Sequence, residues 1–446
     1  MIIYLLLLGI IFESSIIFLV FKDFIAPAFV FNITFLMATL NYVTNYNKWG
    51  SQASLDFALI VFIGITVYSL TSIISEYMVS KFFSNNRYKT IGRYNTPEIK
   101  VRNAIVILFI AFEIIISILF AKYLISVTAK YGTDGTLSSA VSMYQYLSKF
   151  TTVHFNIPSY VIYGYIIVTS SGYVWGYILE NNYLYNKKVN LWILIAFLIS
   201  IVSSLLTGSR GEVIHIIITM IIFYVVKKKI ISNQKSIKVF INIVMIMVVL
   251  TLSFEGVAKL LGRDASLNMY DYISVYLGAP LENFNNYLKT FGLNGLDVTS
   301  IPGANTFRTQ INWINSYRGL DGQLTVLNPI MQYSNGYNLG NVFTTFKFFY
   351  ADAGIYGIIL FTAIMALIIQ VLYSIIKRLD LNEGKVRISF LIYGYLFTGA
   401  MLSFFSNRFY ESITIVFIER IICWIALCYI VVKSQNVLGG SYGKIK

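Results

Sequence analysis

The sequence predicts an all-α polytopic membrane protein with about 11 transmembrane helices and one large extracytoplasmic loop that contains amphipathic helices. Hydrophobic residues make up 57% of the 446 residues, charged residues only 12%, and the mean hydropathy is +0.70. A soluble protein would carry about a quarter charged residues to solvate its surface. This composition excludes an assembly of soluble domains, although the length alone would allow roughly two or three.

Each transmembrane helix needs roughly 20 mostly apolar residues. We expect the first candidate to be a retained span and not a signal peptide, because it lacks a basic segment and a small-residue cleavage site. The seventh is short, and the glycine-containing segment Thr207–Gly211 ahead of it predicts a tight turn. The candidates lie at residues 2–20, 24–44, 55–78, 103–127, 152–178, 190–207, 212–226, 239–257, 354–376, 388–405 and 413–432.

The distribution of Lys and Arg predicts the orientation of the chain. Cytoplasmic loops of membrane proteins are enriched in these residues. With eleven spans the basic clusters all fall on one side and include about two thirds of the Lys and Arg residues. We therefore expect the N-terminus outside and the C-terminus in the cytoplasm, and we interpret the net charge of +14 as membrane topology and not as a nucleic-acid site. The clusters lie at residues 80–102, 187–188, 227–238, 377–387 and 433–446.

The longest loop is predicted on the outer side, and loops of this length are usually functional. Met269–Leu277 and Leu281–Leu288 are typical of amphipathic helices, with a Gly-Ala-Pro break between them. The later part is rich in turn residues, and its aromatic content indicates a position on the membrane surface. The predicted division of the chain is residues 1–257 with eight spans, 258–340 as the outer loop, and 341–446 with three spans and a cytoplasmic tail.

Several arginines fall on the predicted outer side, where the topology rule does not explain them. The planar guanidinium matches phosphate oxygens and stays charged at any working pH. We therefore expect these arginines to bind the diphosphate of a lipid-linked substrate at the membrane surface, with structural ion pairs as the alternative for Arg210 and Arg420. The set is Arg210, Arg263, Arg308, Arg318 and Arg408, together with Arg420 inside the last span.

Four segments resemble the Wzy-type O-antigen and capsule repeat-unit polymerases of bacteria. Arg308 and Gly319 also fit a loose arginine–glycine spacing that occurs in the large outer loops of this family. The resemblance covers the whole chain in architecture, whereas its motifs are confined to residues 207–410. The segments are Thr207–Gly211, Tyr276–Phe284, Gly340–Thr344 with Phe349–Gly354, and Ser406–Tyr410.

The resemblance implies a membrane glycosyltransferase of GT-C type in the bacterial inner (cytoplasmic) membrane. Such an enzyme transfers a growing glycan from one undecaprenyl-diphosphate carrier to the sugar end of another lipid-linked unit, in O-antigen or capsule synthesis. The implied partners are the donor and acceptor lipids, membrane lipid, and a chain-length regulator and flippase of the same pathway. We expect no metal and no other cofactor, because arginines neutralise the diphosphate and the two histidines and two cysteines, Cys423 and Cys428, have no metal-ligand spacing.

This chemistry requires groups that stabilise the leaving diphosphate and a base for the attacking hydroxyl. A structural, hydrogen-bonded role is the alternative for His215. The aromatic candidates for sugar contacts could equally anchor the loop in the membrane. The catalytic candidates are Arg210, Glu212, His215 and Asp352, and the glycan-binding candidates are Tyr270, Trp313, Asn341, Tyr350 and Tyr410.

Two other functions remain open at this point. An O-antigen ligase would have the same fold and a similar set of outer arginines, and it would use a different acceptor. A lipid-linked oligosaccharide flippase would carry charges through the whole bundle and show related halves with interrupted helices. The sequence has no detectable repeat halves, and its unexplained charges lie on one side, so the polymerase is the preferred hypothesis.

Overall fold

The computed structural model is predominantly helical over the residues that it describes. Five of the described helices are long and apolar enough to cross a membrane, which confirms a helical membrane architecture at this level, while the number of about 11 spans stays a prediction. The described residues are 1–83, 97–151, 153, 155, 157–208, 210–232, 269–292, 303–317, 329–379, 381 and 384–433. The five helices are α1 (Ile2–Phe21), α2 (Pro27–Asn45), α3 (Leu55–Phe83), α4 (Asn103–Thr128) and α13 (Thr345–Ile376).

Five further helices correspond to shorter or more polar predicted spans. The predicted span at 152–178 begins later than expected, at Ser159, because Pro158 disfavours a helical conformation of the residue before it and so starts the helix instead. An additional helix, α5 (Leu137–Phe150), precedes it. The predicted span at 239–257 lies outside the described residues. The five are α6 (Ser159–Asn186), α7 (Leu191–Ser204), α8 (Arg210–Ser232), α14 (Ile388–Met401) and α16 (Ile415–Val431).

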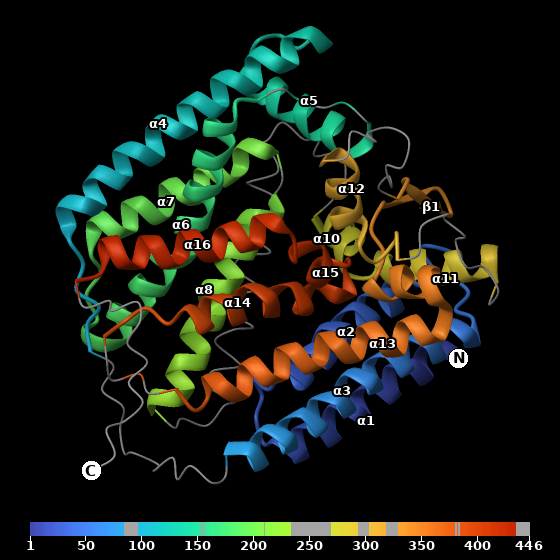
Figure 1. The fold of residues 1–446 in the computed structure, drawn as a ribbon. Helices are drawn as coiled ribbons and strands as arrows, with labels where there is room; N and C mark the ends of the chain where they lie inside the picture. The colour runs from blue at the N-terminus through green and yellow to red at the C-terminus, as the bar shows by residue number, and fades with distance from the viewer. Residues whose placement is uncertain are drawn as a thin grey trace.

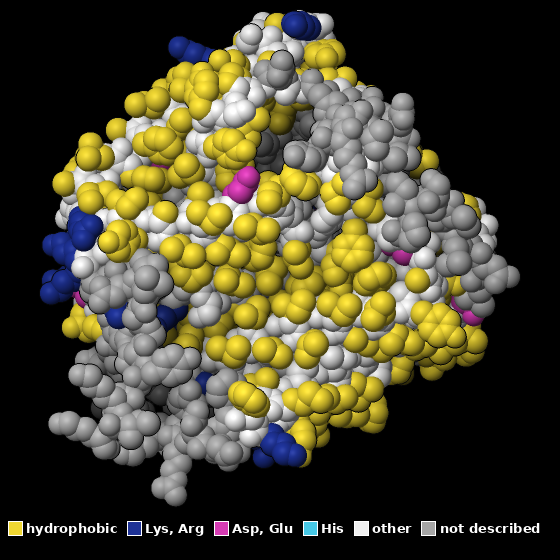
Figure 2. Space-filling view, viewed as in Figure 1, with side chains coloured by type: hydrophobic (Ala, Val, Ile, Leu, Met, Phe, Trp, Pro, Cys, Tyr) yellow, Lys and Arg dark blue, Asp and Glu magenta, His cyan; other side chains and the backbone are white. Residues whose placement is uncertain are grey.

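The helices form two packed groups that share one interface. Helices α1, α2, α3 and α13 pack together, and helices α4, α6, α7, α8 and α16 form the second group. Helix α14 contacts α13 and α2 on one side and α8 and α16 on the other (Figure 1). Small residues allow close approach at this interface, since a Cβ on Gly394 of α14 would lie 2.5 Å from the Phe223 ring of α8. Figure 2 shows how far apolar side chains cover the visible face of the bundle.

One end of the bundle, which we call the loop end, carries short elements together with the N-terminus (Figure 1). Helix α11 contributes Leu281, Phe284 and Leu288 to the core and packs on α2 and α3. The second of the two predicted amphipathic helices is therefore present as α11, and its apolar face is buried by protein. The short elements are α10 (Met269–Leu277), α11 (Ala279–Phe291), α12 (Arg308–Tyr317), α15 (Arg408–Ser412) and the hairpin of β1 (Gln332–Ser334) and β2 (Tyr337–Gly340).

Helix α13 is interrupted near the loop end. Ala353 and Gly354 leave the helical conformation, and Gly354 has φ +59°. The predicted span at 354–376 therefore covers only the part after this kink, while the helix itself begins at Thr345. The Thr344 side chain accepts a hydrogen bond from the Phe346 amide and so caps the first turn.

The opposite end of the bundle, which we call the tail end, is rich in basic side chains. Asp23 forms an ion pair with Lys229, and Glu76 pairs with Lys377 at 3.1 Å and with Arg378 at 3.6 Å. These contacts join the α1–α2 connection, α3, α8 and the end of α13. Most of the Lys and Arg side chains visible in Figure 2 lie toward this end, at the left and below.

Candidate functional site

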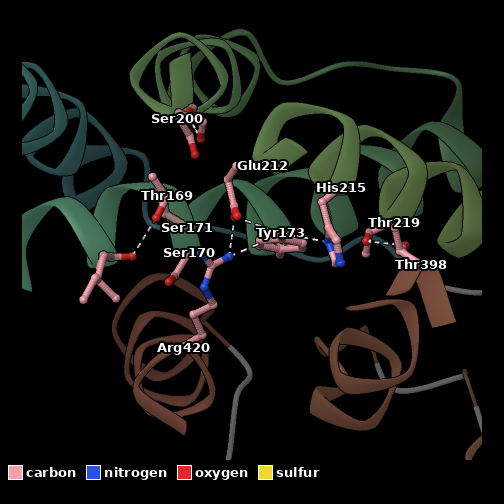
Figure 3. A network of polar contacts seen from close by, with 12 residues as sticks. Thr169, Ser170, Ser171, Tyr173, Ser200, Glu212, His215, Thr219, Thr398 and Arg420 are labelled. Carbon is pink, nitrogen blue, oxygen red and sulfur yellow. Dashed lines mark hydrogen bonds and ion pairs between the residues drawn. The ribbon is translucent and has the colours of Figure 1, made fainter. Parts of the chain in front are cut away.

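A buried polar network joins α6, α8 and α16 (Figure 3). It includes the early part of α16, the helix that follows α15 of the loop end. Arg420 of α16 forms an ion pair with Glu212 of α8. Tyr173 of α6 lies between them, because its hydroxyl donates to Glu212 Oε1 at 3.1 Å and accepts from Arg420 Nη1 at 3.3 Å. The same hydroxyl lies 3.0 Å from His215 Nδ1. One tyrosine therefore connects the acid, the base and the arginine.

The network is mostly shielded from solvent. Arg420 and His215 are buried, Tyr173 is fully buried, and only Glu212 keeps 25% of its side chain exposed. Tyr395 of α14 closes the cluster, with its ring centroid 4.5 Å from that of His215. The Arg420 guanidinium carbon lies 5.7 Å and 5.5 Å from the ring centroids of Tyr173 and Tyr395. Carboxylate and aromatic rings together thus balance the buried charge of Arg420.

Glycines allow close packing of α6 against α7, and of the turn before α8 against α5. A Cβ on Gly172, next to Tyr173, would lie 2.6 Å from Ser200 Oγ of α7. The tight turn predicted at Thr207–Gly211 is confirmed in part: a 3₁₀ turn at Leu205–Thr207 ends at Gly208 with φ +68°, whereas Arg210 and Gly211 already belong to α8. A Cβ on Gly208 would also lie 2.9 Å from the Cβ of Gln145 in α5. The turn therefore requires glycine for both its backbone conformation and its contact with α5.

A second charged cluster lies on α12 and α15. Arg308 forms an ion pair with Glu411, whereas Arg408 Nη1 lies 3.9 Å from Glu411 Oε2. The exposed fraction of the Arg408 side chain is 42%, against 13% for Arg308 and 8% for Arg420. Helix α15, which carries Arg408, packs against α14, and Tyr395 of α14 lies against the His215 ring. Of these three guanidinium groups, Arg408 is the most accessible and the most loosely paired.

Three of the six predicted phosphate-binding arginines have no described side chain. Arg263 and Arg318 lie outside the described residues. Helix α8 begins at Arg210, but the placement of its side chain is outside the description as well. The structure therefore brings together Arg420, Glu212 and His215 from the predicted set, and it places Arg408 on α15, which packs against α14 beside them.

Asp352 has a different environment from the other two candidate bases. Its Oδ1 accepts hydrogen bonds from the Asn305 amide and side chain at 3.0 Å and 3.1 Å, and its Oδ2 accepts from the Thr306 amide at 2.7 Å. In this arrangement the carboxylate holds the turn before α12. Glu212 and His215 are therefore the stronger candidates for proton transfer.

The predicted glycan-binding residues are distributed around the loop end. Tyr270 is half exposed, and its hydroxyl lies 2.7 Å from Thr44 Oγ1 of α2. Trp313 is also half exposed, on α12, and Asn341 is partly buried after β2. Tyr350 is buried, as is Tyr410, whose hydroxyl donates to the Phe361 carbonyl at 2.7 Å. The exposed rings of Tyr270 and Trp313 are the members of this set best placed to contact a soluble sugar.

Tyr173 was not among the residues singled out from the sequence. The chain contains 34 tyrosines, and Tyr173 lies in a predicted span with no charged neighbour in the sequence. The adjacent Ser170, Ser171 and Gly172 indicate close helix packing, but they do not identify a partner. Only the contact of α6 with α8 and α16 reveals its role.

Comparison with known proteins gives no match that would identify this arrangement. No protein-family model matches the chain, and neither a curated protein nor a solved structure matches it. Among the described residues, no three His, Cys, Asp or Glu side chains come together as a metal-binding group. The two charged clusters and their surroundings are therefore the features of this chain that bear on its function.

Proposed function

We propose that this protein is a membrane glycosyltransferase that polymerises undecaprenyl-diphosphate-linked oligosaccharide repeat units into O-antigen or capsular polysaccharide. The observation that carries the proposal is an accessible and loosely paired guanidinium, that of Arg408 on helix α15. Helix α15 packs against α14, whose Tyr395 covers His215 of the buried network. The arrangement offers a phosphate-binding cation beside a candidate base. The sequence resemblance supports the same reaction.

The proposed reaction joins a sugar hydroxyl of the acceptor to the anomeric carbon of the donor glycan. The new carbon–oxygen bond forms as the bond from the anomeric carbon to the diphosphate breaks, and the carrier diphosphate leaves with the bonding electrons. Arg408 would stabilise the charge that develops on this leaving group. His215 or Glu212 would accept the hydroxyl proton. Neither role requires a metal ion.

The proposal includes an orientation and a set of partners. In it, the loop end faces the outer side of the bacterial inner membrane, with the N-terminus outside and the basic tail end at the cytoplasmic face. The donor and acceptor are two undecaprenyl-diphosphate-linked oligosaccharides whose chains stay in the bilayer. A chain-length regulator and a flippase of the same pathway would act beside it.

The test compares Arg408→Ala with Arg378→Ala, a substitution of a partly exposed arginine at the tail end. Purified variants are reconstituted with undecaprenyl-diphosphate-linked repeat units, and the glycan length is measured on a gel. Loss of one transition-state donor lowers the rate by about 10²- to 10³-fold. We expect Arg408→Ala to leave single repeat units and Arg378→Ala to make long chains. Long chains from both variants would contradict the assignment of Arg408.

The same reconstitution separates the alternatives. A ligase would transfer the glycan only when a lipid A core acceptor is supplied. A flippase would move the lipid-linked unit across the bilayer without forming a glycosidic bond. Either result would replace the polymerase proposal.

A further inference from the structure

The Tyr173 hydroxyl has a complete set of hydrogen-bond partners, and their chemistry determines where its proton lies. A phenol carries one proton and can accept two hydrogen bonds. Its three neighbours are Glu212 Oε1 at 3.1 Å, Arg420 Nη1 at 3.3 Å and His215 Nδ1 at 3.0 Å (Figure 3). The guanidinium can only donate, so the arrangement of the other two bonds is the open question.

The ion pair answers this question. Glu212 is held as a carboxylate by its contact with Arg420, and a carboxylate can only accept hydrogen bonds. The Tyr173 proton must therefore point to Glu212, because otherwise two oxygen atoms would face each other with no proton between them. The hydroxyl oxygen is then free to accept from His215. This bond requires a proton on His215 Nδ1.

We infer that Tyr173 is a positioning residue that holds His215 in the tautomer with the proton on Nδ1, so that Nε2 keeps a free lone pair. Nε2 is buried and has no hydrogen-bond partner among the described residues, so its lone pair is available to accept a proton. The inference about the tautomer stands on the hydrogen bonds alone. Its use as a base for the sugar hydroxyl rests on the proposed function.

Packing also restricts the histidine ring. Tyr395 covers the ring at a centroid distance of 4.5 Å, and Tyr173 contacts it at a centroid distance of 6.0 Å. A rotated ring would exchange the positions of its nitrogen and carbon atoms and lose the bond to Tyr173. Arg420 and Glu212 thus act through Tyr173 to orient one nitrogen, in the way that a buried carboxylate orients the histidine of a serine hydrolase.

The chain allows a direct measurement, because it contains only two histidines. In His154→Gln, His215 is the single histidine, and ¹⁵N-histidine labelling of the full-length protein in lipid gives its two ring resonances by solid-state NMR. We expect one protonated nitrogen assigned to Nδ1 and one unprotonated nitrogen assigned to Nε2. A proton on Nε2 with an unprotonated Nδ1, or a doubly protonated ring, at neutral pH would overturn the inference.

Tyr173→Phe removes only the hydroxyl, and Tyr393→Phe is its matched control. Tyr393 is a fully buried tyrosine whose hydroxyl has no hydrogen-bond partner in the described part of the chain. In the His154→Gln background we expect Tyr173→Phe to give a mixture of both tautomers and Tyr393→Phe to leave the spectrum unchanged. Unchanged ring resonances in Tyr173→Phe would contradict the positioning role. If Tyr173→Phe does not fold, the spectrum of the His154→Gln protein alone decides.

The glycan assay separates this inference from the proposed function. Tyr173→Phe should slow polymerisation by about 10- to 100-fold, which is part of what a positioned base contributes. The predicted tautomer in a protein that forms no glycan would reject the proposed function and keep the hydrogen-bond inference. Normal polymerisation by Tyr173→Phe with mixed tautomers would reject the catalytic use of this orientation.

Discussion

The two ends of helix α8 carry buried ion pairs of different character. Toward the loop end, Glu212 pairs with Arg420 and keeps 25% of its side chain exposed. Toward the tail end, Lys227 pairs with Glu180 of α6 at 2.7 Å, and both side chains are inaccessible, at 0% and 1% exposure. The same helix therefore holds one pair that is closed off from solvent and one that is partly open.

The ammonium group of Lys227 in the tail-end pair contacts a carboxylate, an aromatic ring and an amide oxygen. Lys227 Nζ lies 3.2 Å from the centroid of the Tyr177 ring and 3.4 Å from Asn181 Oδ1. Glu180 Oε1 has no hydrogen-bond partner, but its charge is neutralised by the neighbouring ammonium. A pair of this kind joins α6 to α8 and is closed off from solvent.

The loop-end network instead contains His215, whose Nε2 has a lone pair that can accept a proton. The accessible Arg408 lies on α15, which packs against the neighbouring α14. Here the ion pair between Glu212 and Arg420 orients Tyr173 and through it His215. The comparison teaches that buried charge in this bundle serves two purposes. One pair fixes two helices together, whereas the other fixes the chemistry of a neighbouring side chain.

The largest expected effect concerns His215. His215→Gln should lower the rate of polymerisation by about 10²- to 10⁴-fold, because it removes the candidate base. His154→Gln is the control, and the rate of glycan elongation by reconstituted protein is the measurement. Full activity of His215→Gln would show that the network of Glu212, Arg420, Tyr173 and His215 has only a structural role, like the pair of Glu180 and Lys227.

The second effect concerns the sealed pair. Glu180→Gln leaves Lys227 as an uncompensated buried charge and should lower the free energy of unfolding by about 3–5 kcal/mol. Thermal unfolding in mild detergent measures the loss. The double variant Lys227→Met/Glu180→Leu should recover most of the stability, since a buried pair can be replaced by apolar side chains at little cost.

A glutamate-to-glutamine substitution in the other ion pair of α8, between Glu212 and Arg420, tests how the two pairs differ. Glu212→Gln should cost less stability than Glu180→Gln, because Glu212 is partly solvated and Arg420 keeps its aromatic contacts. Its activity per folded molecule should nevertheless fall, whereas that of Glu180→Gln should stay near the wild-type value. Equal loss of activity in both variants would show that the two pairs do not differ in purpose.

A smaller effect is expected at the turn that starts α8. Gly208→Ala should destabilise the protein by about 1–2 kcal/mol through its left-handed conformation, with a further cost from contact with Gln145. Gly132→Ala is a matched control, because Gly132 has φ +79° and a Cβ there would meet nothing within 4 Å. A comparison of melting temperatures separates the conformational cost from the crowding. Equal shifts would show that α5 yields at this contact.

The smallest effect concerns Asp134, which lies before α5 at the loop end. Hydrogen bonds from the Ser139 and Thr136 hydroxyls lower the pKa of the Asp134 carboxyl to about 2. Because the pKa is lower in the folded state, the stabilisation of α5 is complete above the unfolded pKa of about 4 and is lost as the pH falls toward 2. Amide exchange in α5 should therefore be faster in Asp134→Asn than in wild type at pH 7.

The difference between these two proteins should shrink at a pH near 3. A constant difference across this range would mean that the charge of Asp134 does not stabilise the start of α5. In that case the stability of α5 would depend on its other contacts.

The helices themselves were largely predictable from local sequence. Met269–Leu277 was expected as an amphipathic helix and is helix α10, with a break at the following glycine and proline. The turn before α8 was expected from its glycines. By contrast, α5 was missed and the start of α6 was placed too early, because aromatic and apolar residues before Pro158 extend the hydropathy signal beyond the helix.

The candidate site was predictable only in part. Glu212 and His215 were identified because they lie on one face of a helix just after a glycine turn, and Arg420 because a charge within a span needs a partner. The identity of that partner is a contact across 208 positions of the chain. Asp352 was also expected to act as a base, and its use in holding the turn before α12 depends on the Asn305 and Thr306 amides.

By itself, the sequence determined that this is a helical membrane protein with basic residues concentrated in particular loops, because apolar length and charge act locally along the chain. The tertiary structure decided which charges meet. Hydropathy does not encode the rotation of one helix against another, and only that rotation brings Tyr173 between Arg420, Glu212 and His215. The tyrosine that appears as one more apolar residue in the sequence thereby becomes the centre of the network.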